Sequence, residues 1–187
     1  MRIISGAKRG FILNPPRKLT LRPTTDLCKE SIFNILDNHF YFENISVLEL
    51  FAGTGNISFE FASRGCNDIT CVDINKKCIH WIINESSRLG FDFIEAIKAD
   101  SLVYLDHFAH IGYDIIFADP PYDYKDHARI HEYVFNKELL KDNGWLLIEH
   151  DKSNNFSNLP YYSESRIYGQ SAVSLFKNIK SLDNNNL

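Results

Sequence analysis

An apolar run passes directly into a glycine turn in Val47-Leu48-Glu49-Leu50-Phe51-Ala52-Gly53-Thr54-Gly55-Asn56, and this transition is the main indication of the fold class. The run at 47–51 predicts a buried strand, and the pattern at 56–64 predicts a helix after the turn. Such a turn lets a ligand lie against bare backbone at the first crossover of a doubly wound sheet. Plain strand-to-helix turns also contain glycine, so other residues must decide whether a ligand binds here.

Strand-like and helix-like segments alternate along the rest of the chain. Short apolar runs typical of buried strands occur at 69–72, 94–97, 114–118 and 145–148. Patterns of helical length lie between them, at 75–89, 101–109 and 127–141. This alternation predicts a parallel sheet covered on both faces, because a crossover helix is the usual link between parallel strands. Two final runs, at 162–168 and 172–176, predict an antiparallel pair at the edge of the sheet.

The first part of the chain has a different pattern. Apolar residues on both sides of a basic tip at Lys8 and Arg9 predict a short hairpin. A proline-containing basic loop follows, and Thr24-Thr25-Asp26 offers capping groups for a helix whose apolar stripe ends at Phe40. We therefore predict an amino-terminal extension at 1–43, one α/β domain at 44–180 and a disordered tail at 181–187.

The composition is that of an ordinary globular protein. The chain has 187 residues, of which 44% are hydrophobic and 24% charged, which excludes disordered and collagen-like classes. It has no apolar run of about 18 residues and no signal-peptide pattern, so we expect a cytosolic protein. The four cysteines form no C-x-x-C pair and the histidines no cluster, so we expect neither disulfides nor a metal site.

Charge is distributed unevenly along the chain. The formal net charge of −4 argues at first against a nucleic-acid partner, because binding to phosphate needs a basic surface. Residues 1–30, however, contain seven basic and two acidic residues and carry +5, whereas the remaining chain carries −9. We expect the basic leader to face nucleic acid and to lie near the active edge of an acidic body.

Two acidic residues extend the ligand prediction made for the glycine turn. Asp73 ends the second strand twenty positions after Gly53, where a carboxylate can accept hydrogen bonds from a ribose diol. Position 58 is Ser58 rather than the third glycine of the dinucleotide fingerprint, which favours a nucleoside without a pyrophosphate. Asp100 follows the third strand and could either meet the edge of an adenine ring or cap the next helix.

The fourth strand ends in Ala118-Asp119-Pro120-Pro121-Tyr122. The prolines end the strand and fix the turn, because they cannot donate to a sheet ladder. The Asp119 carboxylate and the Pro120 carbonyl could then bind the N–H groups of a planar amine and favour positive charge developing on its nitrogen. Tyr122 offers a ring on which the target base can stack, typically worth about 1–3 kcal/mol. Glu149-His150, at the end of the fifth strand, could shape the same pocket or serve a structural role.

These motifs carry a resemblance to a known family. The segments Glu49 to Gly55 and Asp119 to Tyr122 are similar to motifs of class I S-adenosylmethionine-dependent methyltransferases that modify amino nitrogens. Most of the chain resembles one such family, the bacterial 16S ribosomal RNA guanine-N2 methyltransferases. Its more specific marks here are Met1-Arg2-Ile3-Ile4-Ser5-Gly6, Leu21-Arg22-Pro23-Thr24-Thr25-Asp26, Phe33-Asn34-Ile35-Leu36, Ser63-Arg64-Gly65 and Tyr168-Gly169-Gln170-Ser171-Ala172-Val173-Ser174-Leu175-Phe176. Asp73 stands where the family more often has glutamate.

The resemblance implies a Rossmann-like class I methyltransferase sheet and assigns roles to particular residues. Those implied to bind S-adenosylmethionine are Thr25, Glu49, Phe51, Gly53, Thr54, Gly55, Asp73, Ile74, Asp100 and Ser101. Those implied to hold the guanine and carry catalysis are Asp119, Pro120, Pro121 and Tyr122. Those expected to contact RNA are Lys8, Arg9, Arg17, Lys18, Arg22 and Thr24.

The expected protein is a monomer that acts on 16S rRNA within an assembled or partly assembled small ribosomal subunit. Two alternatives stay open. A DNA adenine-N6 methyltransferase would use the same Asp-Pro-Pro-Tyr motif, although the compact chain has no evident target-recognition domain. A ribosome-assembly factor that has lost catalysis would keep the fold but would have no chemical need for the whole set of motifs.

Overall fold

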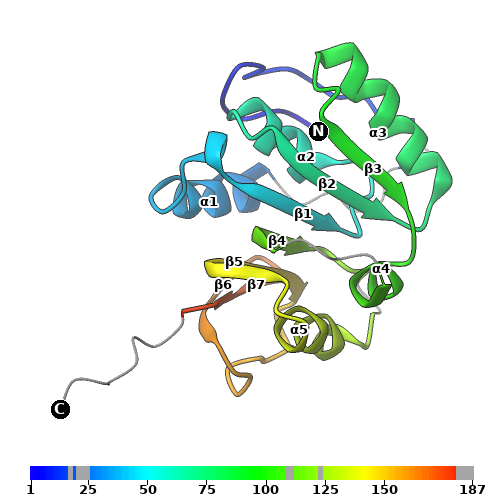
Figure 1. Cartoon of the computed structure of the whole chain (residues 1–187). Coiled ribbons are helices and arrows are strands. Elements are labelled where there is room, and N and C mark those ends of the chain that lie inside the picture. Colours follow the sequence, from blue (N-terminus) through cyan, green and yellow to red (C-terminus); the bar gives the residue numbers. More distant parts are fainter. Residues whose placement is uncertain (17–18, 20–25, 108–111, 122–123, 180–187) are drawn as a thin grey trace.

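The computed structural model describes residues 1–16, 19, 26–107, 112–121 and 124–179. Figure 1 shows a central sheet with helices packed against it. The strands are β1 (Ser46–Leu50), β2 (Asp68–Asp73), β3 (Ile94–Lys98), β4 (Tyr113–Ala118), β5 (Leu140–Asp151), β6 (Tyr162–Tyr168) and β7 (Ser171–Lys177). The helices are α1 (Asp26–Asp37), α2 (Asn56–Ser63), α3 (Lys76–Leu89), α4 (Ser101–His107) and α5 (His127–Asn136), with a 3-10 helix, η2, at Phe42–Asn44.

The strand order is β3-β2-β1-β4-β5-β7-β6. Strands β1 to β5 are parallel, and β7 pairs antiparallel with both β5 and β6. The chain leaves β1 in one direction toward β2 and β3 and later returns to the other side of β1 at β4, so the order reverses between β1 and β4. Ligands of doubly wound sheets bind outside the carboxyl ends of the strands at such a reversal. The predicted α/β sheet and its antiparallel carboxyl-terminal pair are confirmed.

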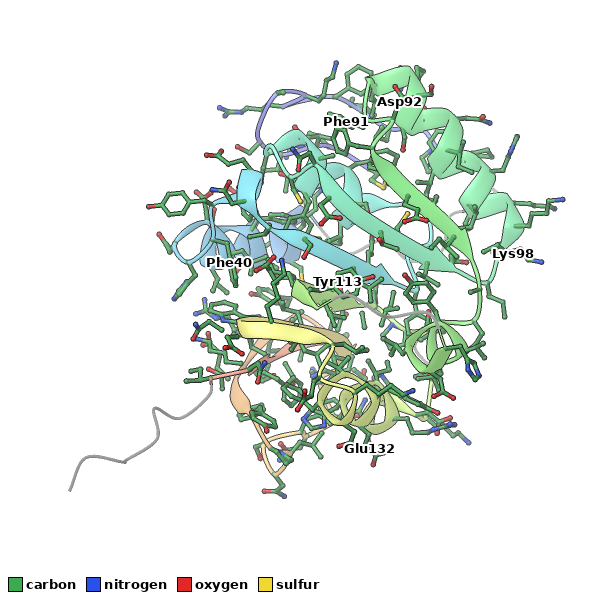
Figure 2. All side chains as sticks on the ribbon, viewed as in Figure 1. Phe40, Phe91, Asp92, Lys98, Tyr113 and Glu132 are labelled. Carbon is green, nitrogen blue, oxygen red and sulfur yellow. The ribbon has the colours of Figure 1, made fainter. Side chains whose placement is uncertain are left out.

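The sheet buries both of its faces. Val47 and Phe117 belong to a core that includes side chains of α1, α2 and α3. Their strand neighbours Leu48 and Ile116 belong to a second core, which includes side chains of α4 and α5. Successive side chains of a strand point to opposite faces, and burial on both faces explains why the strands are almost continuously apolar. In Figure 2, Lys98 and Glu132 project outward from the ends of this packed body.

The amino-terminal hairpin is present and packs against α2. Arg2 and Ile12 form an antiparallel bridge, and the Ile3 amide donates to the Phe11 carbonyl at 2.9 Å. The turn presses on the last residue of α2, where the Ala7 amide donates to the Ser63 carbonyl at 2.6 Å. Ile3 lies in the same core as α1, α2 and α3, so the predicted extension shares a hydrophobic core with the domain that follows it.

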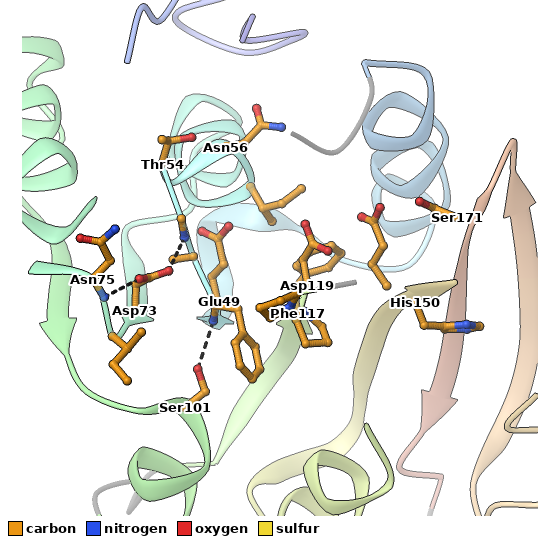
Figure 3. A pocket seen from close by; sticks show the side chains of 18 of the residues that line it. Glu49, Thr54, Asn56, Asp73, Asn75, Ser101, Phe117, Asp119, His150 and Ser171 are labelled. Atoms are coloured by element: carbon orange, nitrogen blue, oxygen red, sulfur yellow. Dashed lines mark hydrogen bonds between the residues drawn. The ribbon is translucent and has the colours of Figure 1, made fainter. Parts of the chain in front are cut away.

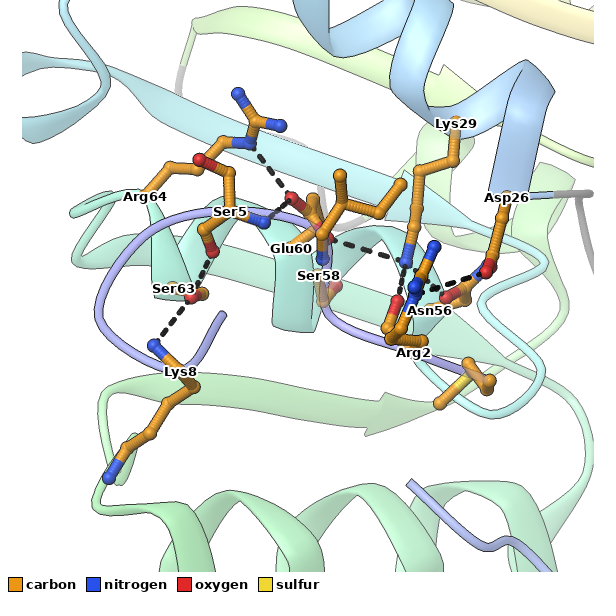
Figure 4. Close-up of polar contacts among 12 residues, drawn as sticks. Arg2, Ser5, Lys8, Asp26, Lys29, Asn56, Ser58, Glu60, Ser63 and Arg64 are labelled. Atoms are coloured by element: carbon orange, nitrogen blue, oxygen red, sulfur yellow. Dashed lines mark hydrogen bonds and ion pairs between the residues drawn. The ribbon is translucent and has the colours of Figure 1, made fainter. Parts of the chain in front are cut away.

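A buried ion pair joins the hairpin, α1 and α2, as Figure 4 shows. Lys29 Nζ lies 3.3 Å from Glu60 Oε2 and donates to the carbonyl of Arg2 at 2.6 Å and to Asn56 Oδ1 at 2.8 Å. Glu60 also accepts from the amides of Ile4 and Ser5 at 2.8 and 3.0 Å. Burial lowers the pKa of Lys29, and the Glu60 carboxylate opposes that effect. The pair therefore has the hydrogen bonds that a buried pair of charges needs.

Two predicted boundaries on the carboxyl-terminal side are wrong. The helix predicted at 127–141 ends at Asn136, and the strand predicted at 145–148 runs from Leu140 to Asp151. Glu138 stops the helix, because its φ of 52° lies in the left-handed region that a helix cannot contain. The early part of β5 is interrupted at Asn143, with φ 64°, where the register against β4 shifts.

Helix α2 ends at Ser63 and α3 begins at Lys76, within one residue of the predicted boundaries. The predicted end of the first helix is wrong, because α1 ends at Asp37 and Phe40 lies beyond it. Phe40 is apolar because it packs edge-on against Trp145, and not because it continues the helical stripe. The part of the predicted helix 101–109 beyond His107, the capping residues Thr24 and Thr25, and the tail at 181–187 lie outside the described residues. Among the helices described, none is long and apolar enough to cross a membrane.

Candidate active site

A cavity of about 440 Å³ opens at the carboxyl edge of the sheet, where the strand order reverses. It extends from the glycine turn and Asp73 past Glu49 to Asp119, and on to the end of β5 and the start of β7 (Figure 3). Its volume is in the range of small-molecule sites. Residues predicted from distant parts of the sequence therefore line one pocket.

The glycine turn exposes backbone to this pocket. Gly53 and Gly55 have φ of 53° and 74°, a conformation in which glycine is not strained. A side chain at Gly53 would come no nearer than 3.9 Å to its neighbours, so the space beside its backbone is open to a ligand. Phe51 has φ 56°, which costs a residue with a side chain roughly 1–2 kcal/mol, and its amide donates to Ser101 Oγ at 3.2 Å.

Asp73 fixes the turn to the end of β2. Its carboxylate accepts from the amides of Gly53 and Asn75, each at 2.7 Å, and the residue is buried. An ionised carboxylate has about four lone-pair sites, so it can keep both amides and still accept from hydroxyl groups. Asp73 can thus orient a diol against the glycine turn.

Glu49 is a buried carboxyl group in the middle of the cavity lining. The amide of Ser58 donates to Glu49 Oε2 at 2.9 Å, and the Ser58 hydroxyl donates to the same oxygen. Burial raises the pKa of Glu49 to about 7, although these hydrogen bonds act in the opposite direction. The group therefore changes its charge near neutral pH, and a cation bound beside it would favour the ionised form.

The adenine end of the predicted cofactor site is assembled around the start of α4. Asp100 lines the cavity and also caps α4, because its Oδ1 accepts from the amides of Leu102 and Val103 at 2.9 and 3.1 Å. The capping role considered for Asp100 is confirmed, and its contact with adenine stays a prediction. Ile74 and Ser101 line the same end, with Ile74 66% exposed.

Asp119, Pro120 and Pro121 line the opposite end of the cavity. Strand β4 ends at Ala118, as the prolines predict, and the Asp119 amide donates to the carbonyl of Leu50 at 3.5 Å. The turn continues with a hydrogen bond of 2.8 Å from the Tyr124 amide to the Pro121 carbonyl. Tyr122, the predicted stacking residue, lies outside the described residues.

Several lining residues were not assigned to a site from the sequence. They are Leu19, Cys28, Ala52, Asn56, Ile57, Asn75, Phe117, His127, Asp151, Tyr168 and Ser171. His127 comes from the first turn of α5, and burial lowers its pKa. Only the pairing of β7 with β5 brings Ser171 to this edge, opposite Asp151. The sequence predicts that the two final runs lie at the edge of the sheet, but no local pattern specifies which of them pairs with β5.

Glu149 and His150, considered for this pocket from the sequence, both line it. They point in different directions, as neighbours on a strand do. The His150 ring contacts the Asp151 carbonyl at 2.7 Å and Ser174 Oγ at 2.8 Å, and burial lowers its pKa. These contacts hold the imidazole in a structural position beside the cavity.

The predicted RNA-contacting residues fall into two groups. Lys8 and Arg9 lie on the hairpin turn, where the Lys8 amide donates to Ser63 Oγ at 2.9 Å at the carboxyl-terminal end of α2. The glycine turn is at the opposite end of that helix, so the structure does not bring Lys8 and Arg9 to the cavity. The remaining predicted contacts, together with the predicted cofactor contact Thr25, lie outside the described residues: Arg17, Lys18, Arg22 and Thr24.

The amino terminus itself approaches the glycine turn. The hydroxyl of Thr54 donates to the Met1 sulfur at 3.4 Å, and Thr54 lines the cavity. Among the residues described, no group of three or more His, Cys, Asp or Glu side chains is arranged to hold a metal ion. The polar groups that line the cavity are mainly acceptors, which suits a ligand rich in hydroxyl, amino and cationic groups.

The residues present fit S-adenosylmethionine. The open backbone at Gly53 leaves room for its chain, the Asp73 carboxylate can accept from its ribose hydroxyls, and Glu49 provides an acidic group for its positively charged part. The fold and this site, together with the named relatives reported next, define a class I S-adenosylmethionine-dependent methyltransferase. The predicted cofactor is therefore confirmed at the level of the class.

The chain belongs to the family described as "Conserved hypothetical protein 95", whose model matches residues 1–177. It is 31% identical to the ribosomal RNA small subunit methyltransferase D of Escherichia coli K12, over 80% of this chain and 71% of that protein. It is 32% identical to the protein of the same name from Buchnera aphidicola of Acyrthosiphon pisum, over 80% of this chain and 78% of that protein. These relatives confirm the family resemblance found in the sequence.

A solved structure shares the fold of almost the whole chain. The structure of a hypothetical protein of Thermus thermophilus superposes with a TM-score of 0.82 at 24% identity, covering 94% of this chain and 98% of that one. At this identity the likeness concerns the fold alone.

Proposed function

We propose that the protein transfers a methyl group from S-adenosylmethionine to the exocyclic N2 amine of a guanine in 16S ribosomal RNA. The observation that carries the proposal is that one cavity joins the glycine turn and Asp73 to Asp119 and Pro120. Methyl transfer needs the donor and the accepting amine held in line at short distance, and positioning of this kind supplies much of the rate enhancement.

At the cofactor end, the chain orients the donor. Asp73 holds the ribose, Ile74 and Ser101 border the adenine, and the backbone of Gly53 allows close approach. The bound cofactor supplies a methyl group on a positively charged sulfur. The Glu49 carboxylate, in its ionised form, stabilises positive charge in the middle of the cavity.

At the amine end, the chain favours the reactive state of the nitrogen. The Asp119 carboxylate and the Pro120 carbonyl accept hydrogen bonds from the two N–H groups, which stabilises the positive charge that develops as the nitrogen attacks. The prolines keep these acceptors in place before the base arrives. We assign Asp119 the role of acceptor, because the proton can leave the nitrogen after the methyl group has been transferred.

An RNA substrate is supported by two observations. The relatives reported above carry names that specify ribosomal RNA of the small subunit, and residues 1–30 of this chain carry a net charge of +5. The target base must leave its stack to reach the cavity, which is easiest in a single-stranded loop. We further propose that a monomer acts in the cytoplasm on an assembled or partly assembled small subunit.

The alternative substrate is adenine N6 in DNA, since the amine-binding motif would serve it as well. Sequence-specific action on DNA usually needs a module that reads base edges in a groove. Residues 1–16 and 26–37 instead pack against α2 or share its core, which leaves no separate module among the described residues. The other alternative, an inactive assembly factor, gives no reason for Asp73, Glu49 and Asp119 to line one cavity.

One experiment tests the proposal. The protein is incubated with S-adenosylmethionine labelled in its methyl group and with naked 16S RNA, unmethylated small subunits or DNA, and the products are digested to nucleosides. We expect label in N2-methylguanosine from RNA or subunits. Label in N6-methyladenosine would show that the alternative substrate is correct, and label in no nucleoside would show that the protein is not an active RNA or DNA methyltransferase.

A further inference from the structure

Glu149 lies beside Asp119 at the amine end of the cavity, on the neighbouring strand. Strands β4 and β5 are parallel, and Ala118 is the register partner of Ile148. Asp119 and Glu149 each follow these partners by one residue, so their backbones lie at the same level, about 5 Å apart as adjacent strands are. Both residues line the cavity, and Glu149 is 8% exposed.

The two carboxylates also face the same helix. Asp119 follows Phe117 by two residues, and Glu149 follows Leu147 by two, so each carboxylate points to the same face of the sheet as that apolar residue. Phe117 and Leu147 belong, with Val47, to the core that contains Phe33 of α1. Burial raises the pKa of the Cys28 thiol of α1, and the charges of Glu149 and Asp119 raise it further. Both carboxylates therefore lie within electrostatic reach of one side chain that itself lines the cavity.

A pair of neighbouring acceptors matches guanine and not adenine. The Watson–Crick edge of guanine carries an N1–H donor next to its N2 amine, whereas adenine has a bare N1 acceptor next to its N6 amine. A carboxylate is acceptor-only when ionised. It would hydrogen-bond to guanine N1–H but would face adenine N1 with lone pair against lone pair, and buried polar groups left unpaired discriminate strongly between substrates.

We propose that Glu149 accepts the N1–H of the target guanine while Asp119 binds its N2 amine, so that Glu149 determines the choice of base. The proposal rests on the proposed function, because it concerns the base placed at that end of the cavity. It does not require Glu149 to lack other partners, since a carboxylate can accept from several donors at once. Glu149 selects the base, and Asp119 serves the reacting nitrogen.

The test uses 2-aminopurine, which keeps the N2 amine of guanine but has a bare N1. RNA substrates carrying guanosine or 2-aminopurine riboside at the methylated position are compared in the wild-type protein and in Glu149→Gln. The wild-type protein should prefer guanosine by at least about tenfold in kcat/KM. The glutamine amide can donate to the bare N1, so Glu149→Gln should reduce this preference by about tenfold, mainly by a gain on 2-aminopurine.

The ratio of kcat/KM for the two substrates within one protein cancels any general loss of activity. Comparing this ratio between the wild-type protein and Glu149→Gln cancels the effect of the missing guanine O6. Glu95→Gln, an exposed carboxylate on β3 of the same sheet, is the matched control and should keep the wild-type preference. Cofactor binding and thermal unfolding of Glu149→Gln show whether the variant is folded. If the variant is not folded, the wild-type protein alone tests the proposal. Equal wild-type rates on the two substrates would overturn it. A preference for guanosine that persists when N1 of guanine is replaced by carbon bearing hydrogen would overturn it as well, because that base has no N1–H to donate.

The outcomes separate this inference from the proposed function. A wild-type protein that forms N2-methylguanosine, together with an unchanged preference in Glu149→Gln, would overturn the role of Glu149 and leave the proposed function standing. A wild-type protein that forms no N2-methylguanosine on any RNA would overturn both. A gain on 2-aminopurine in Glu149→Gln would support the inference, because a merely structural role of Glu149 would not create activity on a new base.

Discussion

Asp119 occupies the position where the two halves of the proposed reaction meet, at the end of β4. Asp119→Ala should reduce methyl transfer at least about a hundredfold, the usual loss when one group that stabilises transition-state charge is removed. Cofactor affinity should change no more than about threefold, because Asp73 and the glycine turn are untouched. Single-turnover transfer and equilibrium cofactor binding measure the two quantities. Equal losses in both would mean that Asp119 serves the cofactor and not the amine.

Glu49 makes stability depend on pH. Burial raises its pKa to about 7 in the folded protein, so folding favours its protonated form. The contribution of Glu49 to the free energy of unfolding is fully present at pH values below the pKa of this group in the unfolded chain. It is lost as the pH rises through the pKa of the group in the folded protein. Glu49→Gln, which cannot ionise, should therefore gain stability relative to wild type between pH 5 and pH 8, by up to about 3 kcal/mol.

Denaturant unfolding of the ligand-free protein at several pH values checks this expectation. Glu95→Gln provides the control, since that side chain is exposed and should give a difference that does not vary with pH. A constant difference between Glu49→Gln and wild type would show that Glu49 keeps an ordinary pKa in the folded protein.

The contact between the hairpin and α2 depends on Gly6. A Cβ at this position would lie 1.8 Å from the carbonyl oxygen of Ser63, and φ is +79°. Gly6→Ala should therefore separate the hairpin from α2 and lower the unfolding free energy by roughly 2–4 kcal/mol. Thermal unfolding measures the total effect, and hydrogen exchange of the Ala7 amide, which donates to Ser63, reports the local one.

Gly10 gives a matched control for this prediction. It has φ +80°, but a Cβ at this position would meet nothing within 4 Å, so Gly10→Ala carries only the conformational cost of about 1–2 kcal/mol. Equal effects of the two substitutions would show that the close approach to Ser63 contributes nothing and that only backbone strain matters.

Element types were largely predictable, whereas several boundaries and contacts were not. The strand at 47–51 and its glycine turn are local patterns, and the structure has them where the sequence predicts. The end of α5 was missed because it depends on the left-handed conformation of Glu138, a residue with no bias toward it. The buried Lys29–Glu60 pair was missed because lysine and glutamate usually mark solvent, and only the hairpin brings donors to both sides of Glu60.

The site was predictable in the same unequal way. Asp73 and Asp119 end strands within recognisable motifs, so their convergence follows from the topology of a parallel sheet. Ser171 reaches the cavity only through the pairing of β7 with β5, which no local pattern specifies. The prediction that the basic leader lies beside the active edge rests on charge alone. In the structure, Lys8 lies at the end of α2 that is far from the cavity.

Lys8 and Arg9 lie at the end of α2 away from the cavity, which separates RNA affinity from the methyl-transfer step. Replacing Lys8, Arg9, Arg17 and Lys18 with alanine should weaken RNA binding and flatten its dependence on salt, by about 0.7–0.9 in the log–log slope for each phosphate that is no longer neutralised. Because Lys8 and Arg9 do not reach the cavity, the Lys8→Ala, Arg9→Ala pair should raise KM for RNA and leave kcat within about twofold. Steady-state kinetics over a range of salt concentrations measure both effects.

An unchanged salt dependence in the fourfold variant would place the phosphate contacts elsewhere. A fall in kcat for the Lys8→Ala, Arg9→Ala pair, with KM unchanged, would show that the hairpin influences the transfer step itself. The cofactor affinity of each variant serves as the control for folding of the cavity.

The two outermost strands carry charged side chains. Glu95 and Lys98 are exposed on β3, and β6 carries the half-buried Glu164 and the exposed Arg166, which lie 3.3 Å apart. Replacing Glu164 and Arg166 with valine should increase light scattering on storage or mild heating, whereas Arg129→Val with Glu132→Val on α5 should not. No difference between these pairs would show that the charges on β6 do not matter.

An open sheet offers unpaired backbone groups at both of its ends, and neighbouring molecules can add strands to them. Charged side chains on edge strands disfavour such an addition, and both β3 and β6 carry them. We therefore expect the residues at the margins of the sheet to limit aggregation, while the order of strands at its centre creates the cavity.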